Sequence, residues 1–354
     1  MYFTVLLLVS FILAISFTIL IKKIAFKFNI LDQPDDTRKK HRKPIPLLGG
    51  IAIWSAFWLV TGYIAFFTST FSRSITHTQL LGIFIGSLIL VILGIFDDIY
   101  SLSPKLRLPV TLVAVLLVII SGVGLKEITN PFGGTINLQL FLIPLKSLDT
   151  LFTLGNLVVF FWLMGMMYTT KILDGLDGLA TGITLIGSLM IFFLTQTTKF
   201  YQPEVGLLAL IFAGCCLGFL IFNFHPAKIF LGESGSLFIG FMLGILAVIS
   251  GGKIATALLV MAVPILDLAR VILTRFFSGK KISVGDREHL HFRLRDRGIS
   301  ETTTVIILYS ISFLFGLTTL VLPSRLKIAT LGILLLGMVG IGIWLAKERQ
   351  HYKG

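Results

Sequence analysis

The sequence carries few charges and almost no cysteine, and each shortage excludes a class of protein. Of its 354 residues, 13% are charged and 55% are hydrophobic, and the mean hydropathy is +0.95. Soluble globular domains carry about 25% charged residues, so this composition excludes a soluble domain. The two cysteines, Cys215 and Cys216, are adjacent in an apolar run. We interpret them as small packing residues that say nothing about the redox compartment.

Two further patterns are missing. The apolar runs lack the alternation of apolar and polar residues, over about ten residues, that is typical of outer-membrane barrels. No basic segment precedes the first apolar run, and Lys22 and Lys23 follow it. That run therefore indicates a retained membrane anchor and not a cleaved signal peptide.

Long apolar runs are what the sequence has instead. Runs of about 17–25 residues can cross a hydrocarbon core of about 30 Å as helices. Eleven occur, at residues 2–21, 47–69, 78–96, 107–125, 151–170, 179–195, 205–222, 234–250, 254–275, 303–322 and 328–346. We expect an all-α, polytopic membrane protein with about 11 transmembrane helices, in which residues 1–354 form a single integral-membrane domain.

The basic residues predict the orientation in the membrane. If the N-terminus lies outside, 23 of the 30 Lys and Arg residues fall in inside segments and seven in outside segments. Because cytoplasmic loops are enriched in Lys and Arg, the predicted orientation is N-out/C-in. The net charge of +13 is then largely cytoplasmic, where it suits anionic lipid head groups and phosphate-bearing substrates.

The most informative stretch is residues 171–178, Lys-Ile-Leu-Asp-Gly-Leu-Asp-Gly, which lies between two apolar runs. Each charge costs roughly 2.5–3.5 kcal/mol at the centre of a membrane helix. Asp174 and Asp177 share one face of a helical turn, and Gly175 lets a ligand approach the backbone closely. A polar helix end at the membrane surface is the alternative. We favour a binding site, because other polar clusters are predicted on the same membrane face.

A pair of adjacent acids ends the third apolar run. Asp97 and Asp98 are either simply solvated or serve as a general base or metal shell facing a phosphate substrate. Lys105 and Arg107 follow in the same short loop and supply the opposing charge.

Two other inside loops carry candidate site residues. The loop at 31–46 serves at least as a positive-inside anchor, but its prolines and His41 also suit a site for an anionic group. The segment 223–236 has small residues just before a helix start, a weak signal for a phosphate cradle. Its Phe230 is either an interfacial aromatic or a stacking partner for a base.

The last inside loop is rich in basic residues. Asp267 and Arg270 are expected to pair on one helix face, in a structural role. A metal site made of two histidines two residues apart is disfavoured without a further ligand. We interpret four residues of this loop as phosphate or sugar contacts, namely Arg287, His289, His291 and Arg293.

The one long outside loop, residues 126–150, has a turn signal. Gly133 and Gly134 precede alternating apolar residues, which predicts a small external β-hairpin with a structural role.

Taken together and in order, five clusters resemble the polyprenyl-phosphate N-acetylhexosamine-1-phosphate transferase family (glycosyltransferase family 4). They are Asp32-Gln-Pro-Asp through His41 to Gly50, Gly94-Ile-Phe-Asp97-Asp98 through Arg107, Asp174-Gly-Leu-Asp177-Gly, Asn223 through Phe230 to Ser236, and Asp286-Arg-Glu-His289-Leu-His291. The resemblance covers roughly residues 30–300. The last cluster is more similar to the GlcNAc-type branch than to the phospho-MurNAc-pentapeptide translocase.

The resemblance implies a reaction. The phosphate of a polyprenyl (undecaprenyl) phosphate attacks the β-phosphorus of a UDP-sugar such as UDP-GlcNAc, which releases UMP and starts a lipid-linked cell-envelope glycan, as in cell wall polysaccharide biosynthesis. It also implies Mg²⁺, an active site on the cytoplasmic side of the plasma (inner) membrane, no nucleic-acid partner, and a homodimer as one allowed assembly.

Motif positions imply roles for individual residues. The resemblance makes Asp97 or Asp98 the acceptor of the lipid-phosphate proton or a metal ligand, and it adds Asp174 to the catalytic set. Asp177, with the backbone of Gly175 and Leu176, contacts the uracil, on which Phe230 stacks. Phosphate charge is neutralised by Lys105, Arg287, His289 and His291. This assignment follows the logic of phosphoryl transfer, which is positioning plus electrostatic stabilisation.

The chain departs from the family pattern at the expected metal ligands. Lys171 stands where the family has an Asn ligand, and Glu233 stands where it has an Asp ligand. Tyr168 and Phe292 also replace the family's usual Asn and His. An ammonium group cannot ligate Mg²⁺ and repels it.

Three explanations remain open. Lys171 replaces the metal and is neutralised by Glu233; or Mg²⁺ moves to Asp97, Asp98, Asp174 and the substrate; or the chain is a catalytically inactive homologue that only binds a nucleotide-sugar or lipid phosphate. We favour an active enzyme, because a decayed site has no reason to retain its acids, bases and glycines. A transporter is disfavoured, because the polar residues gather at one membrane face and not at the midplane.

Overall fold

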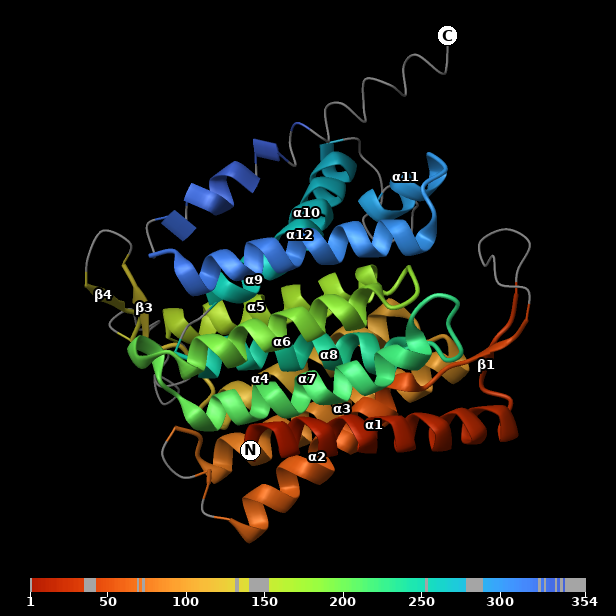
Figure 1. Ribbon diagram of the computed structural model, residues 1–354, viewed down its shortest axis with the longest axis horizontal. Helices are drawn as coiled ribbons and strands as arrows, with labels where there is room; N and C mark the ends of the chain where they lie inside the picture. The colour runs from red at the N-terminus through yellow and green to blue at the C-terminus, as the bar shows by residue number, and fades with distance from the viewer. Residues whose placement is uncertain are drawn as a thin grey trace.

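The computed structural model is a bundle of long helices with two small hairpins (Figure 1). The structure describes residues 2–34, 43–68, 70–71, 74–130, 134–139, 153–251, 254–277 and 289–323, together with most positions between 326 and 340. Four helices precede the β3–β4 hairpin, namely α1 (Tyr2–Lys27), α2 (Gly49–Phe67), α3 (His77–Tyr100) and α4 (Pro104–Ile120). The later ones are α5 (Leu154–Leu173), α6 (Leu179–Gln196), η1 (Thr198–Phe200), α7 (Pro203–Asn223), α8 (Gly232–Ile249), α9 (Ile254–Val260), α10 (Ala262–Phe277), α11 (Leu290–Asp296) and α12 (Glu301–Val321).

The predicted all-α membrane class is confirmed. Ten of the eleven predicted apolar runs occur as helices, with modest shifts of their ends. Among the described residues, eight helices are long and apolar enough to cross a membrane. A ninth crossing results if α9 and α10, which meet at a bend of 77°, form one broken span. The run predicted at 328–346 lies largely outside the described residues, so the number 11 stays a prediction, as does the N-out/C-in orientation.

One predicted span is shorter than expected. Helix α4 has 17 residues, fewer than the predicted run at 107–125, and is at the short limit of the roughly 17–25 residues that can cross the hydrocarbon core. Ser103 and Pro104 begin this helix, and Pro is favoured at a first helical position because no N–H bond is lost there. This start places Lys105 and Arg107 in the first turn, close to the end of α3.

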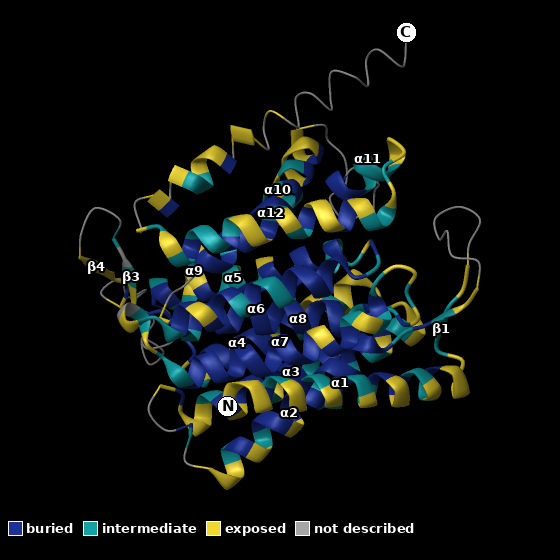
Figure 2. Cartoon of the chain, in the orientation of Figure 1, coloured by how far each residue is buried: buried dark blue, intermediate teal, exposed yellow. Residues whose placement is uncertain are grey.

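Helices α7 and α8 form the buried centre of the bundle (Figure 2). Both carry apolar residues on every side, as expected for helices that other helices surround. Cys215 and Cys216 are buried in α7, which confirms their interpretation as packing residues. Helices α1 and α2 cover one side of this centre, and α6 packs on the other, with α12 packed on α6 (Figure 1).

Small residues bring three helices together at one end of the bundle. A Cβ on Gly94 of α3 would overlap the backbone of Ser234, and one on Gly50 of α2 would overlap the backbone of Gly235. Only glycine permits this close approach. The first turn of α8 is therefore held directly against α2 and α3.

The two hairpins lie at opposite ends of the bundle (Figure 1). β3 (Glu127–Thr129) pairs with β4 (Thr135–Asn137) in an antiparallel register, which confirms the hairpin predicted in the 126–150 loop. β1 (Leu31–Asp32) pairs with β2 (Ile45–Pro46) at the other end. The Phe230 N–H donates to the Pro46 carbonyl at 2.8 Å, so the first loop is joined to the segment that leads into α8.

Candidate active site

Three helix ends carrying predicted site residues converge beside the β1–β2 hairpin. They are the C-terminal end of α3 with Asp97 and Asp98, the C-terminal end of α5 with Lys171, and the first turn of α8 with Glu233. The Glu233 N–H donates to Asp98 Oδ1 at 2.9 Å. One residue before Lys171, the hydroxyl of Thr170 donates to the Ser236 carbonyl at 2.7 Å, which fixes α5 against α8.

A chain of ion pairs runs across this junction. Lys171 Nζ lies 2.7 Å from Glu233 Oε2. One Arg107 nitrogen lies 2.9 Å from Asp97 Oδ2 and 3.7 Å from Glu233 Oε1. The predicted pairing of Arg107 with the acidic pair is confirmed for Asp97. Asp97 is 4% exposed, whereas the other three side chains are 23–27% exposed, so a substrate can reach them.

The two adjacent acids have different surroundings. Asp97 accepts the Leu102 N–H at 2.7 Å in addition to the Arg107 bond, so both of its oxygens are engaged. Asp98 Oδ2 is buried and has no hydrogen-bond partner among the described residues. It lies beside Gly232, whose φ of +73° favours glycine. Of the two, Asp98 has the oxygen left over for a substrate.

Asp174 follows the last residue of α5 and lies close to other acidic side chains. Removal from water raises the pKa of this carboxyl well above its usual range, and the nearby charges of Glu233, Asp98 and Asp177 raise it further. Asp174 is therefore protonated more readily than an ordinary aspartate, which suits a hydrogen-bond donor to an anionic ligand.

The predicted histidines lie on a network that begins in α10. Asp267 pairs with Arg270 at 2.7 Å, as expected, and also accepts from His289 Nδ1 and the Leu290 N–H at 2.9 and 3.0 Å. Asp267, held by Arg270, therefore also orients the His289 ring. The His289 and His291 rings are parallel to within 6° at a centroid distance of 5.8 Å.

His291 is buried and has an unusual proton affinity. Loss of hydration, together with the neighbouring His289, lowers its pKa to about 4. The imidazole is therefore neutral at pH 7, and any contact with phosphate is a hydrogen bond and not a charge pair. Its Nε2 has no partner among the described residues, and it lies close to Gly175.

Acidification is expected to destabilise the protein through His291. The pKa is about 4 when folded and 6.5 for the unperturbed group, so between these values the unfolded chain binds a proton that the folded chain does not. Stability therefore falls as pH drops from about 7 to 4, by up to roughly 3 kcal/mol. Melting temperatures at pH 7 and 5 measure the effect. The decrease in melting temperature from pH 7 to pH 5 should be smaller for His291→Gln than for wild type. It should equal that of wild type for the control His77→Gln, which replaces an exposed histidine. Equal decreases in all three proteins would contradict this account.

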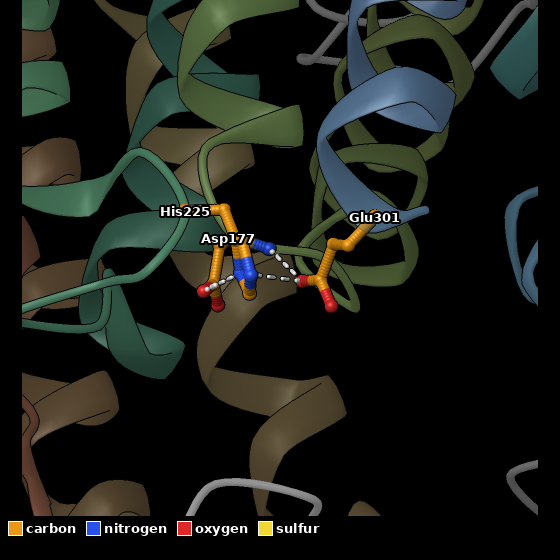
Figure 3. A group of neighbouring side chains, drawn as sticks. All are labelled: Asp177, His225 and Glu301. Atoms are coloured by element: carbon orange, nitrogen blue, oxygen red, sulfur yellow. Dashed lines mark hydrogen bonds and ion pairs between the residues drawn. The ribbon is translucent and has the colours of Figure 1, made fainter. Parts of the chain in front are cut away.

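A second cluster joins the 171–178 stretch to α12. The side chains of Asp177, His225 and Glu301 point toward one another (Figure 3). His225 Nδ1 lies 2.8 Å from Asp177 Oδ2, which also accepts the Ala227 N–H at 3.0 Å. Glu301 Oε1 accepts the Asp177 N–H at 3.0 Å, and Arg295 lies 3.0 Å from its other oxygen. This cluster fixes the Gly175–Gly178 turn.

Sequence reasoning did not single out His225 or Glu301. His225 lies in the segment 223–236 but was assigned no role there. Glu301 lies 124 residues beyond its partner Asp177 in the sequence. The one local signal for Glu301 was its place just before the apolar run predicted at 303–322, where acids are common near a helix start.

The remaining predicted site residues have varied positions. Leu176 is buried, Gly175 and Lys105 are exposed, and Phe230 is half-buried. The Phe230 backbone accepts the Gly49 N–H at 3.0 Å, which ties it to the start of α2. His41 and Arg287 lie outside the described residues, so their roles stay predictions.

The carboxylates at the ends of α3 and α8 do not fit the magnesium site that the resemblance implies. Among the described residues, one group of three carboxylate, imidazole or thiol ligands has all its ligand atoms within 4.8 Å, and it is Asp177, His225 and Glu301. Asp97 and Glu233 hold Arg107 and Lys171 instead. A divalent cation 4 Å from an ammonium group is repelled by about 8 kcal/mol at an effective dielectric constant near 20.

Comparison with known proteins gives a consistent result. A model of glycosyl transferase family 4 matches residues 80–251. The chain is 32% identical to a probable undecaprenyl-phosphate N-acetylglucosaminyl 1-phosphate transferase of Bacillus subtilis, over 89% of this chain and 84% of that protein. It is 30% identical to an undecaprenyl-phosphate alpha-N-acetylglucosaminyl 1-phosphate transferase of Thermotoga maritima, over 87% and 86%. A decaprenyl-phosphate N-acetylglucosaminephosphotransferase of Mycolicibacterium smegmatis is 29% identical, over 82% and 74%. The chain therefore belongs to glycosyl transferase family 4, the family that its five motifs resemble.

Proposed function

We propose that this protein transfers GlcNAc-1-phosphate from UDP-GlcNAc to undecaprenyl phosphate and releases UMP. The observation that carries the proposal is the convergence of Asp98, Lys171 and Glu233 at one end of the bundle, in a chain whose relatives are named for this transfer. We place this end at the cytoplasmic face of the inner membrane, where the basic residues gather.

The reaction is a displacement at phosphorus. An oxygen of the lipid phosphate forms a bond to the β-phosphorus of the UDP-sugar, and the bond from that phosphorus to the bridging oxygen breaks. The bridging oxygen leaves with UMP, and the product is undecaprenyl diphosphate-GlcNAc. Catalysis of this kind needs positioned groups and cations more than covalent chemistry.

The site residues have different roles in this reaction. The unpartnered oxygen of Asp98 accepts the proton of the attacking lipid phosphate or holds that phosphate in position. Lys171 and Arg107 face the negative charge of the phosphates. Asp177 and the Gly175–Leu176 backbone contact the uracil, while His225 and Glu301 keep this turn in place.

The decisive experiment is UMP release by the purified protein supplied with UDP-GlcNAc and undecaprenyl phosphate. Release that needs both substrates is expected. UDP-GalNAc and UDP-glucose in place of UDP-GlcNAc test the sugar and its acetamido group. No release with any UDP-sugar, together with retained UDP binding, would instead favour a binding protein.

Loss of the Glu301 contact is expected to weaken nucleotide-sugar binding. In Glu301→Ala the Asp177 N–H and His225 lose a partner, so the uracil-binding turn loosens. A lost hydrogen bond of about 1 kcal/mol corresponds to an increase of about fivefold in KM for the UDP-sugar, with a smaller change in kcat. Glu301→Gln is the matched control, because its amide oxygen can still accept the N–H. An unchanged KM in the alanine variant would show that the cluster does not support the site.

A further inference from the structure

The ion pair between Lys171 and Glu233 sits at the centre of the proposed site, between the C-terminal end of α5 and the first turn of α8. The two side chains are 23% and 27% exposed, so part of the pair faces solvent, while Glu233 Oε2 itself is buried. The Thr170–Ser236 hydrogen bond fixes the adjacent backbone. Lys171 is thus held in place by the packing of two helices.

Glu233 has a second cation within reach. Arg107 lies 3.7 Å from its other oxygen and is anchored by Asp97 at 2.9 Å. If a ligand anion takes the Lys171 ammonium, Glu233 keeps Arg107 as a partner and is not left as an uncompensated charge. The free-energy cost of such an exchange is therefore lower than for an isolated ion pair, because breaking an isolated pair leaves one charge without a partner.

The same geometry works against a metal ion bound at Glu233. A divalent cation on Glu233 would have to displace Lys171 or remain beside it. Asp97 already uses both oxygens, on Arg107 and on the Leu102 N–H. Asp97 and Glu233 are thus already paired with cations of the chain itself, which leaves Asp98 Oδ2 as the acceptor at these helix ends without a partner among the described residues.

We propose that Lys171 is the resident cation of this site: it binds the diphosphate of the UDP-sugar in place of a divalent metal ion, and Glu233 neutralises it while the site is empty. This inference rests on the proposed function for the identity of the substrate. On binding, a diphosphate oxygen takes over the contact with the ammonium group, and Glu233 shifts toward Arg107. No bond is made or broken in this exchange.

The first test is direct binding of UDP in EDTA, measured by calorimetry on the purified full-length protein in detergent. Wild type is expected to bind UDP equally well in EDTA and in Mg²⁺. Lys171→Met should weaken binding at least tenfold, and Lys171→Arg, which keeps the charge, should recover most of it. Lys27→Met, which removes an exposed cation at the end of α1, is the control for net charge. Equal affinity of wild type and Lys171→Met would overturn the inference, whether or not the protein turns over any UDP-sugar.

The second test restores the residues that the family pattern has at these two positions. The double variant Lys171→Asn with Glu233→Asp is expected to require Mg²⁺ for UDP binding and to hold Mn²⁺ detectable by electron paramagnetic resonance. The wild type should hold none at this site. EDTA should lower the rate of UMP release by wild type less than twofold. It should lower the rate of release by the double variant more than tenfold. Wild-type release that collapses in EDTA and returns with Mg²⁺ would overturn the inference and still support the proposed function.

Discussion

Replacement of Asp98 by asparagine is expected to lower the rate of UMP release by about 100- to 10,000-fold, the range that a lost general base or acid covers. The reason is that Asp98 Oδ2 is a buried carboxylate oxygen without a partner among the described residues, whereas Asp98 Oδ1 is fixed by the Glu233 N–H. Asparagine keeps the shape and the fixed oxygen, but it cannot take a proton from the lipid phosphate. The measurement is kcat with both substrates saturating.

Binding and stability separate this role from a structural one. Asp98→Asn should bind UDP within about threefold of wild type and melt at a similar temperature. Asp97→Asn is the informative contrast, because it loosens Arg107 and the Leu102 N–H, so it should lower the melting temperature as well as the rate. If Asp98→Asn retained more than a tenth of the wild-type turnover, Asp98 would not be the group that accepts the proton.

Gly94→Ala is expected to destabilise the bundle strongly. The new Cβ would overlap the backbone of Ser234, and a backbone cannot move aside as a flexible side chain can. Overpacking of this kind typically costs about 1–3 kcal/mol. The displacement also separates α3 from the first turn of α8, so Asp98 loses its position relative to Glu233. A lower melting temperature and a reduced rate of UMP release are expected together.

The matched control is Gly165→Ala in α5, where a Cβ would meet no atom within 4 Å. Removing a glycine from a helix stabilises it by up to about 1 kcal/mol when the space is open, so this variant should melt at the same or a higher temperature. Similar melting temperatures for the two variants would show that the contact between α3 and α8 is not close enough to matter.

Much of the site was predictable from local sequence. Asp97, Asp98, Lys171, Asp174 and Glu233 stand out because charges are rare in this chain and expensive beside hydrocarbon. One of the three explanations left open by the sequence has Glu233 neutralise Lys171, and the 2.7 Å contact shows that the two side chains pair. Whether that pair replaces a metal ion is a matter of function, which the two binding tests address.

Other parts of the site could not have been predicted. The sequence predicted that Arg107 opposes the acidic pair, but not that the nitrogen paired with Asp97 would also lie near Glu233. The cluster of Asp177, His225 and Glu301 joins three segments far apart in sequence. Such contacts depend on how helices pack, and a single sequence gives no measure of that.

What the sequence determined by itself is the class of the protein and the helix ends that carry its candidate site residues. Apolar runs of membrane-spanning length form helices because hydrocarbon leaves backbone polar groups no other partner. Most charges lie toward the ends of those helices because charge is expensive beside hydrocarbon, and the mid-helix charges Asp267 and Arg270 of α10 are paired with each other. The tertiary structure decided which charged ends meet. The close contacts of Gly50 and Gly94 with the start of α8 set that arrangement, because the allowed approach of two backbones depends on side-chain volume at the crossing point and not on local helical preference.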